Sequence, residues 1–254
     1  MKVALVQQDI VWGDRNANLK RLDLALDRTP GAELYVFPEM FTTGFASSPD
    51  SSIDTDPQGT VEWMKSHAKA GCCALAGSIA MEENGKCFNR MYFVKPDGET
   101  IFYDKRHLFS FGGEHLRFTP GNRRVVAEYG GVRFLLTVCY DIRYPVWDRN
   151  LGDYDAMIVS ANWPVARHLV WQTLPVARAI ENQSYVIAVN RVGRDPMCDY
   201  MGGSVLVNPF GIVTARCADD AECEAVGDIN MQFVNEYNSS FPVLDGADKF
   251  EIKI

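Results

Sequence analysis

The sequence lacks the features of several large classes of protein. No apolar run approaches the ~18–20 residues that a membrane-spanning helix needs, and the opening stretch MKVALVQQD becomes polar too early for a secretory signal peptide. Lysine and arginine are not clustered and the net charge is −8, so a basic surface for nucleic acid or an anionic membrane is missing. We therefore expect a soluble cytoplasmic protein with no nucleic-acid or membrane partner.

Cysteine and histidine occur without the spacing of a structural site. The seven cysteines include no C-x-x-C pair, and the four histidines show no H-x-x-x-H or H-x-x-E-H spacing. An odd cysteine count without an export signal argues against a disulfide framework. The missing ligand pairs argue against structural zinc. We expect no metal site.

The composition that remains is typical of a globular protein. Of the 254 residues, 47% are apolar and 23% are charged, which is enough to bury a sizeable core. No stretch resembles a linker, so we predict a single domain over residues 1–254.

Short β-rich runs recur along the chain, with helical patterns between some of them. Several runs are almost continuously apolar, as strands buried on both faces are. Strands are predicted over 3–7, 34–37, 74–79, 91–94, 100–103, 132–138, 156–160, 185–189, 204–207 and 224–229. Helices are predicted over 19–26, from 56 to near 71, and over 167–183, where Pro175 should bend the helix or remove one hydrogen bond. Turn signals at 83–85, 95–98 and 208–211 predict hairpins, and the mixture favours a layered α/β domain.

Cys139 is the first candidate for chemistry. It follows the buried strand 132–138, and Tyr144-Pro145 after it favours the start of a helix. A helix N-terminus lowers the pKa of a nearby thiol, and the backbone N–H of Tyr140 could serve as an oxyanion donor. The competing interpretation is a buried core cysteine, the commonest role of a free cysteine.

Three charged residues are further candidates. Glu39 follows an apolar strand and suits a general base, although most glutamates are solvated surface residues. Lys105 follows another strand between Asp104 and Arg106, so a surface ion-pair cluster is the competing interpretation. Glu114 lies in a glycine-rich loop, where a polar residue either has a function or shapes a turn.

Four ordered motifs join these residues. FPEM, YDKRHLF, GGEHLRFTPG and TVCYDIRYP, in this order and widely spaced, resemble the nitrilase (carbon–nitrogen hydrolase) superfamily over essentially the whole chain. The resemblance implies an α/β fold, specifically a four-layer αββα sandwich. It maps a catalytic Glu–Lys–Cys triad onto Glu39, Lys105 and Cys139, and a second glutamate near the site onto Glu114.

The resemblance also implies thioester chemistry with no metal or organic cofactor. Cys139 would attack the carbonyl of a small amide, while Lys105 and the Tyr140 N–H would stabilise the oxyanion. Glu39 would accept and return protons. Glu114 would orient Lys105 or the substrate, or share in proton transfer.

Segments further along the chain resemble the bacterial omega-amidase group. These are VSANWP, WQTL, ARAIENQ and NRVGRD, and CYDIRYPVWDRN around Cys139 resembles the group as well. The group hydrolyses the ω-amide of short dicarboxylates such as 2-oxoglutaramate and 2-oxosuccinamate. The far carboxylate of such a substrate needs a fixed cation, and arginine is the best planar partner.

Arg143, four residues after Cys139, is the first candidate for this cation, and a structural salt bridge or cap is an equal alternative. Further candidates follow a strand end or a loop that should face the pocket, although the aromatic ones equally suit packing. They are Asn162, Trp163, Arg167, Phe41 and Phe45.

Several alternatives stay open at this level. An aliphatic amidase, an N-carbamoyl amino acid amidohydrolase and a nitrilase share the triad and differ in pocket shape. A non-catalytic binding or scaffolding protein on this fold would have lost a triad member. His107 or His115 could replace Glu39 as the base, and Cys72-Cys73 could sense redox state, although adjacent cysteines rarely form an unstrained disulfide. The family commonly forms homodimers through helices beside Cys139, here around 145–150 and 167–183.

Overall fold

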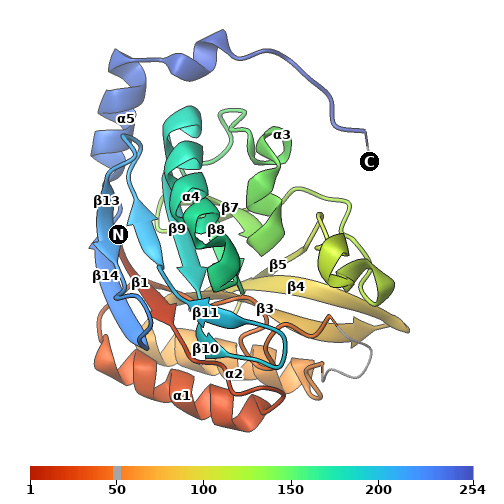
Figure 1. Cartoon of the computed structure of the whole chain (residues 1–254). Coiled ribbons are helices and arrows are strands. Elements are labelled where there is room, and N and C mark those ends of the chain that lie inside the picture. The colour runs from red at the N-terminus through yellow and green to blue at the C-terminus, as the bar shows by residue number, and fades with distance from the viewer. Residues whose placement is uncertain (48–52, 254) are drawn as a thin grey trace.

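Two six-stranded β-sheets face each other, and helices cover their outer surfaces (Figure 1). The computed structural model describes residues 1–47 and 53–253. Within this described part, no helix is both long enough and apolar enough to cross a membrane.

The first sheet has the strand order β14-β1-β2-β3-β4-β5. Its parallel centre, β1 to β3, is flanked by antiparallel strands. The strands are β1 (Lys2–Gln7), β2 (Leu34–Val36), β3 (Ala74–Glu83), β4 (Lys86–Val94), β5 (Thr100–Asp104) and β14 (Cys223–Asp228). Helices α1 (Arg15–Arg28) and α2 (Pro57–Gly71) cover its outer face (Figure 1). Each begins at an aspartate, Asp14 or Asp56, whose side chain accepts a hydrogen bond from a free backbone N–H of the first turn.

The second sheet has the strand order β13-β12-β9-β8-β7-β6, and β7, β8 and β9 are parallel. The strands are β6 (Val126–Tyr129), β7 (Val132–Val138), β8 (Ala156–Ala161), β9 (Tyr185–Asn190), β12 (Val205–Val207) and β13 (Val213–Arg216). Strands β10 (Val192–Arg194) and β11 (Asp199–Met201) form a two-stranded ribbon. The other α-helices of the described residues are α3 (Pro145–Asp148), α4 (His168–Asn182) and α5 (Met231–Ser240), and short 3₁₀ helices lie in several connections.

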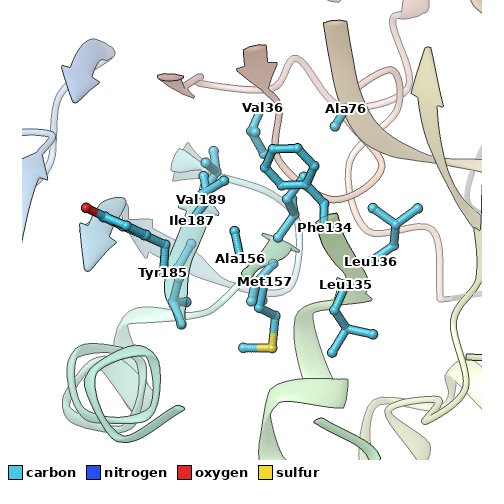
Figure 2. Packing of buried hydrophobic residues seen from close by; sticks show 14 of the residues in the cluster. Val36, Ala76, Phe134, Leu135, Leu136, Ala156, Met157, Tyr185, Ile187 and Val189 are labelled. Atoms are coloured by element: carbon cyan, nitrogen blue, oxygen red, sulfur yellow. The ribbon is translucent and has the colours of Figure 1, made fainter. Parts of the chain in front are cut away.

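The largest core lies between the sheets. Figure 2 shows Phe134 of β7 lying against Val36 and Ala76, which come from the other sheet. A second core fills the space between the first sheet and α1 and α2. Burying each large apolar side chain contributes about 1.5–3 kcal/mol, so both faces of the first sheet are firmly held. The predicted αββα sandwich is confirmed.

The predicted strands and hairpins are present, with ends shifted by a few residues, while β6, β10, β11, β13 and α5 were missed. The missed strands are only three or four residues long, too short for a clear alternation of apolar and polar residues. The predicted helix over 167–183 is α4, and it continues through Pro175, which lacks the N–H that would bond to the preceding turn.

Candidate active site

Strands from both sheets end at one place, and each delivers a candidate residue there. Lys105 directly follows β5, Cys139 directly follows β7 and Asn162 directly follows β8. Glu39 comes three residues after the end of β2. Because the carboxyl ends of parallel strands lie at the same edge of a sheet, residues far apart in the sequence converge at this edge.

Two hydrogen bonds fix the end of β2 against the end of β8 in the opposite sheet. The Ser160 hydroxyl donates to the carbonyl of Phe37 at 2.8 Å, and the Glu39 N–H donates to the carbonyl of Ala161 at 3.4 Å. The position of Glu39 relative to Cys139 is therefore set by contacts between the two sheets.

Lys105 joins the two predicted glutamates in a fully buried ion cluster. Its ammonium lies 2.8 Å from Glu39 Oε1, and 3.1 and 2.9 Å from Glu114 Oε1 and Oε2. The side chains of all three are 0% exposed. The surface interpretations considered for Glu39 and Lys105 are therefore wrong.

Further donors converge on the same carboxylates. Asn89 Nδ2 donates to Glu39 Oε1 at 2.7 Å and to Glu114 Oε1 at 3.0 Å. The backbone N–H of Asn162 donates to Glu39 Oε2 at 3.0 Å, and that of Phe109 to Glu114 Oε2 at 2.5 Å. These contacts all donate toward oxygen, so they suit the ionised form of both glutamates. We call Glu39, Lys105, Glu114 and Asn89 the charged cluster.

Burial and charge act against each other within the charged cluster. Burial alone lowers the pKa of Lys105, but the charges of Glu114 and Glu39 outweigh it and raise the pKa of Lys105 above its ordinary value. Burial raises the pKa of Glu114, the Lys105 charge opposes this rise, and the charge of Glu39 adds to it. Lys105 therefore stays an ammonium at any physiological pH.

Cys139 lies at a strained turn between β7 and a short 3₁₀ helix, Cys139–Arg143. Its φ of 46° lies in the left-handed region, which costs a residue other than glycine about 1–3 kcal/mol. The buried Asp141 holds the turn by accepting hydrogen bonds from the Val138 N–H at 3.0 Å and the Tyr103 hydroxyl at 2.8 Å. Such strain is typical of a nucleophile that must project from a strand end.

The thiol of Cys139 differs from the prediction in one respect. Burial raises its pKa well above the ordinary value, and the charge of Glu39 raises it further. Lys105 and the backbone N–H of Asn162 act in the opposite direction. The 3₁₀ helix that follows is only five residues long, so its dipole is too small to offset burial. The expected lowering of this pKa is therefore wrong: burial and the neighbouring charge of Glu39 raise the pKa of the Cys139 thiol instead.

A cavity of about 220 Å³ opens on Cys139. Most of the residues predicted to contact substrate line it: Phe45, Tyr140, Arg143, Asn162, Trp163 and Arg167, together with Phe109, Asp195 and Tyr200. Phe41 does not line the cavity. It is fully buried in the core beneath the first sheet, where its ring centre lies 5.2 Å from that of Phe37, so its predicted role in substrate binding is corrected to packing.

Two arginines stand on aromatic rings along this cavity. The Arg143 guanidinium carbon lies 5.0 Å from the ring centre of Trp163 and 5.8 Å from that of Tyr140. The Arg167 carbon lies 5.0 Å from the ring centre of Phe109. Neither forms an ion pair with a residue in 1–47 or 53–253, so the structural salt bridge considered for Arg143 finds no partner there. We call these two arginines and three rings the arginine wall.

The side-chain amide of Asn162 faces the same cavity. It lines the cavity with 5% exposure, and among the described residues neither Nδ2 nor Oδ1 has a hydrogen-bond partner. A buried amide without partners costs free energy, and a polar ligand group in the cavity would offset that cost.

The two histidines considered as bases lie elsewhere. His107 contacts Asp141 Oδ1 at 2.8 Å through Nδ1 and stacks on Tyr144, while His115 is exposed. Neither lines the cavity. In the part of the chain that the structure describes, no group of three or more His, Cys, Asp or Glu side chains is placed to hold a metal ion.

A buried thiol beside a carboxylate and an ammonium, opening on a small cavity, is the arrangement of an enzyme that uses a cysteine nucleophile. The model of the carbon–nitrogen hydrolase family matches residues 2–239, and this chain belongs to that family.

Individual relatives and a solved structure are similar to this chain over nearly its whole length. "Omega-amidase YafV" of Escherichia coli (strain K12) is 43% identical over 254 residues, covering 99% of this chain and 98% of the relative. "2-oxoglutaramate amidase" of Bacillus subtilis (strain 168) is 34% identical, covering 97% of each. The solved structure of XC1258 from Xanthomonas campestris, described as a CN-hydrolase superfamily protein with an arsenic adduct in the active site, is 35% identical. It superposes with a TM-score of 0.94 over 100% of this chain and 99% of its own.

Proposed function

We propose that this enzyme hydrolyses the ω-amide of a short dicarboxylate of the 2-oxoglutaramate or 2-oxosuccinamate type, releasing the acid and ammonia. The observation that carries the proposal is that Cys139 lines the same small cavity as two arginines without ionic partners among the described residues. Relatives named omega-amidase and 2-oxoglutaramate amidase support this substrate class.

The first half-reaction forms a thioester. Glu39 accepts the proton of the Cys139 thiol while sulfur attacks the amide carbonyl carbon. Because the pKa of this thiol is raised, a base must take the proton as the sulfur attacks. The carbonyl oxygen becomes an oxyanion held by the Lys105 ammonium and the Tyr140 N–H, and each such donor is worth about 3–4 kcal/mol. The C–N bond then breaks, and Glu39 gives the proton to the departing ammonia.

The second half-reaction releases the acid. Glu39, again a carboxylate, takes a proton from water as the water oxygen attacks the thioester carbonyl. The C–S bond breaks and the proton returns from Glu39 to the sulfur of Cys139. Glu114 contacts Lys105 through both oxygens, and its role is to hold the ammonium in place for the oxyanion of each step.

The arginine wall supplies the recognition of substrate charge. Arg143 would hold the far carboxylate, since its stacking on Trp163 fixes the guanidinium plane. Asn162 would hydrogen-bond a polar group between the two ends of the substrate. Arg167 is the second candidate for the carboxylate, with Phe45 and Trp163 as apolar walls.

A substrate panel with ammonia as the readout tests this function. ω-Amides, simple aliphatic amides, ureido acids and nitriles are compared on the wild type, on Arg143→Met and on Arg133→Met. The control Arg133 pairs with Asp155 outside the cavity. We expect preference for ω-amides, and we expect Arg143→Met to lose ~10- to 100-fold in kcat/KM on them, the worth of one charged hydrogen-bonded contact. Neutral amides should change by less than ~3-fold.

Each contrary result would favour a different function. Preference for simple amides, ureido acids or nitriles would favour another member of the family, and no turnover of any compound would favour a binding or scaffolding protein. If Arg143→Met lost carboxylated and neutral amides equally, the carboxylate would lie elsewhere.

We also propose a cytoplasmic homodimer. The catalytic thiol must stay reduced, which the cytosol ensures. The face of α4 and the adjoining α3 expose Leu169, Ile180 and Val146, at 75%, 50% and 57%, and burial against a second copy would remove this apolar surface from water. Sedimentation tests the dimer, and a monomer at micromolar concentration would contradict it.

A further inference from the structure

Asn89 occupies an inward position of β4. Side chains alternate between the two faces of a strand, and Met91 and Phe93 on the same face pack in the core between the sheets. The next residue, Arg90, points the other way and pairs with Asp104. Asn89 is therefore a polar side chain, 1% exposed, where the pattern of β4 favours an apolar one.

This one residue contacts all three ionised members of the charged cluster. Its amide nitrogen donates to Glu39 Oε1 and to Glu114 Oε1, at 2.7 and 3.0 Å. Its backbone carbonyl accepts the backbone N–H of Lys105 at 2.9 Å. Among the described residues, its Oδ1 has no hydrogen-bond partner, so the bonds to the carboxylates are what orient the amide.

The charges of the cluster explain why a neutral donor is needed. With both carboxyl groups ionised, Glu39 and Glu114 bring two negative charges to the one positive charge of Lys105, and among the described residues the Cys139 thiol also acts on this ammonium. One negative charge is uncompensated in a buried site, where unpaired charge is expensive. An amide lowers the free energy of both anions through hydrogen bonds without adding a charge that would make Glu39 a poorer base.

We propose that Asn89 is a positioning residue for catalysis, whose amide holds Glu39 and Glu114 as a pair of anions around Lys105 so that Glu39 can accept the proton of Cys139. This inference rests on the roles that the proposed function gives to Glu39 and Cys139. A positioning residue differs from a purely structural one because its loss changes the pH dependence of the reaction.

Two substitutions should shift the pH dependence in opposite directions. Asn89→Leu removes the donor, so the carboxylates gain protons more readily, and the deficit in kcat should be largest in acid and shrink as pH rises. Asn89→Asp supplies a donor only while protonated and adds a third negative charge once ionised, so its deficit should grow as pH rises. In both variants we expect kcat to fall ~10- to 100-fold at neutral pH, as small displacements of catalytic groups do, with KM within ~3-fold.

The test measures kcat and KM from about pH 6 to pH 9, spanning the ordinary pKa of a thiol, alongside Tm for each variant. Asn182→Ser is the matched control, since Asn182 is also a fully buried asparagine but bonds to Arg178 and Asn150 instead of the charged cluster. The proposal is overturned if both Asn89 variants keep the wild-type pH profile and lose activity only in step with Tm, as the control would.

A second readout needs no substrate. Alkylation of Cys139 by iodoacetamide, followed on its own peptide by mass spectrometry, should slow at least ~3-fold in Asn89→Asp above neutral pH, because added negative charge disfavours the thiolate. If the wild type hydrolysed no amide while this alkylation still responded to Asn89→Asp, the proposed function would fail and the positioning role would stand. Unchanged alkylation together with an unchanged pH profile would remove the positioning role alone.

Discussion

The charged cluster and the arginine wall meet at Cys139, yet their charges are satisfied in different ways. In the cluster, Lys105 contacts three carboxylate oxygens and its side chain is fully buried. On the wall, Arg143 and Arg167 are partly exposed, rest on aromatic rings and form no ion pair with any described residue. An arginine without an ionic partner inside the protein can bind the charged end of a ligand, whereas the contacts of Lys105 with Glu39 and Glu114 fix the position of its ammonium.

Under the proposed function, this contrast separates chemistry from specificity. The charged cluster would position a base, an oxyanion donor and a nucleophile for any amide that reaches the thiol, which suits the common chemistry of the family. The arginine wall would decide which amides bind. Substitutions in the cluster should therefore affect stability and all substrates together, whereas substitutions in the wall should affect substrates selectively.

The largest effect on activity should come from Cys139→Ala. We expect turnover of every substrate to fall by at least ~10⁴-fold, because without the nucleophile no thioester forms. The fold should persist, since the change removes only one sulfur atom. Steady-state ammonia release and circular dichroism check both points. Substantial residual turnover would remove Cys139 as the nucleophile.

Lys105→Met should separate the two regions by stability. Removing the ammonium leaves Glu39 and Glu114 as buried, uncompensated carboxylates, so we expect the free energy of unfolding to fall by ~3–5 kcal/mol. Arg143→Met, on the partly exposed wall, should cost less than ~1 kcal/mol. Urea denaturation of both variants measures the difference, and equal losses would contradict the contrast.

The raised pKa of Cys139 predicts slow, pH-dependent labelling. At neutral pH iodoacetamide should modify Cys139 more slowly than the exposed Cys72, and the rate at Cys139 should keep rising beyond pH ~8.5, where an ordinary thiol begins to level off. The same shift favours the folded state below the unfolded-state pKa, and this stabilisation is lost as pH rises through the folded-state pKa. Peptide-resolved mass spectrometry measures the rates. A plateau below neutral pH would mean a preformed thiolate.

The smallest effect should come from Phe41→Leu, which tests a residue near the site in sequence but outside the cavity. A volume-reducing apolar change in the core should cost ~1–1.5 kcal/mol of unfolding free energy, with kcat/KM on ω-amides within ~2-fold. Thermal unfolding and the ammonia assay check it. A selective loss of activity on one substrate class would mean that Phe41 contributes to substrate binding after all.

Much of the fold was predictable because its signals are local. Continuous apolar runs such as 132–138 mark strands buried on both faces, and Asp56-Pro57 marks the start of α2. Short strands were not predicted, because they carry too little local signal. β13 is mostly exposed over four residues, so its identity depends on pairing with β12 and leaves no pattern of its own.

The residues of the candidate site also differ in whether a local signal marks them. The order of four motifs identified Glu39, Lys105, Glu114 and Cys139, but Asn89 was missed. The available signal was slight: one polar residue at an inward position of β4, where Met91 and Phe93 are apolar. The role of such a residue can be inferred only when its hydrogen-bond partners are known.

The sequence by itself determined the family and the strand-rich layered architecture, and it predicted Cys139 as the nucleophile, because these depend on local pattern and motif order. Only the tertiary structure decided that Lys105 is buried between two carboxylates, that Phe41 packs in the core, and that burial raises the pKa of the Cys139 thiol. Burial and hydrogen-bond partners come from residues distant in the chain, and these long-range contacts set the electrostatics of each group. Protonation states and pocket walls therefore follow from how the two sheets meet.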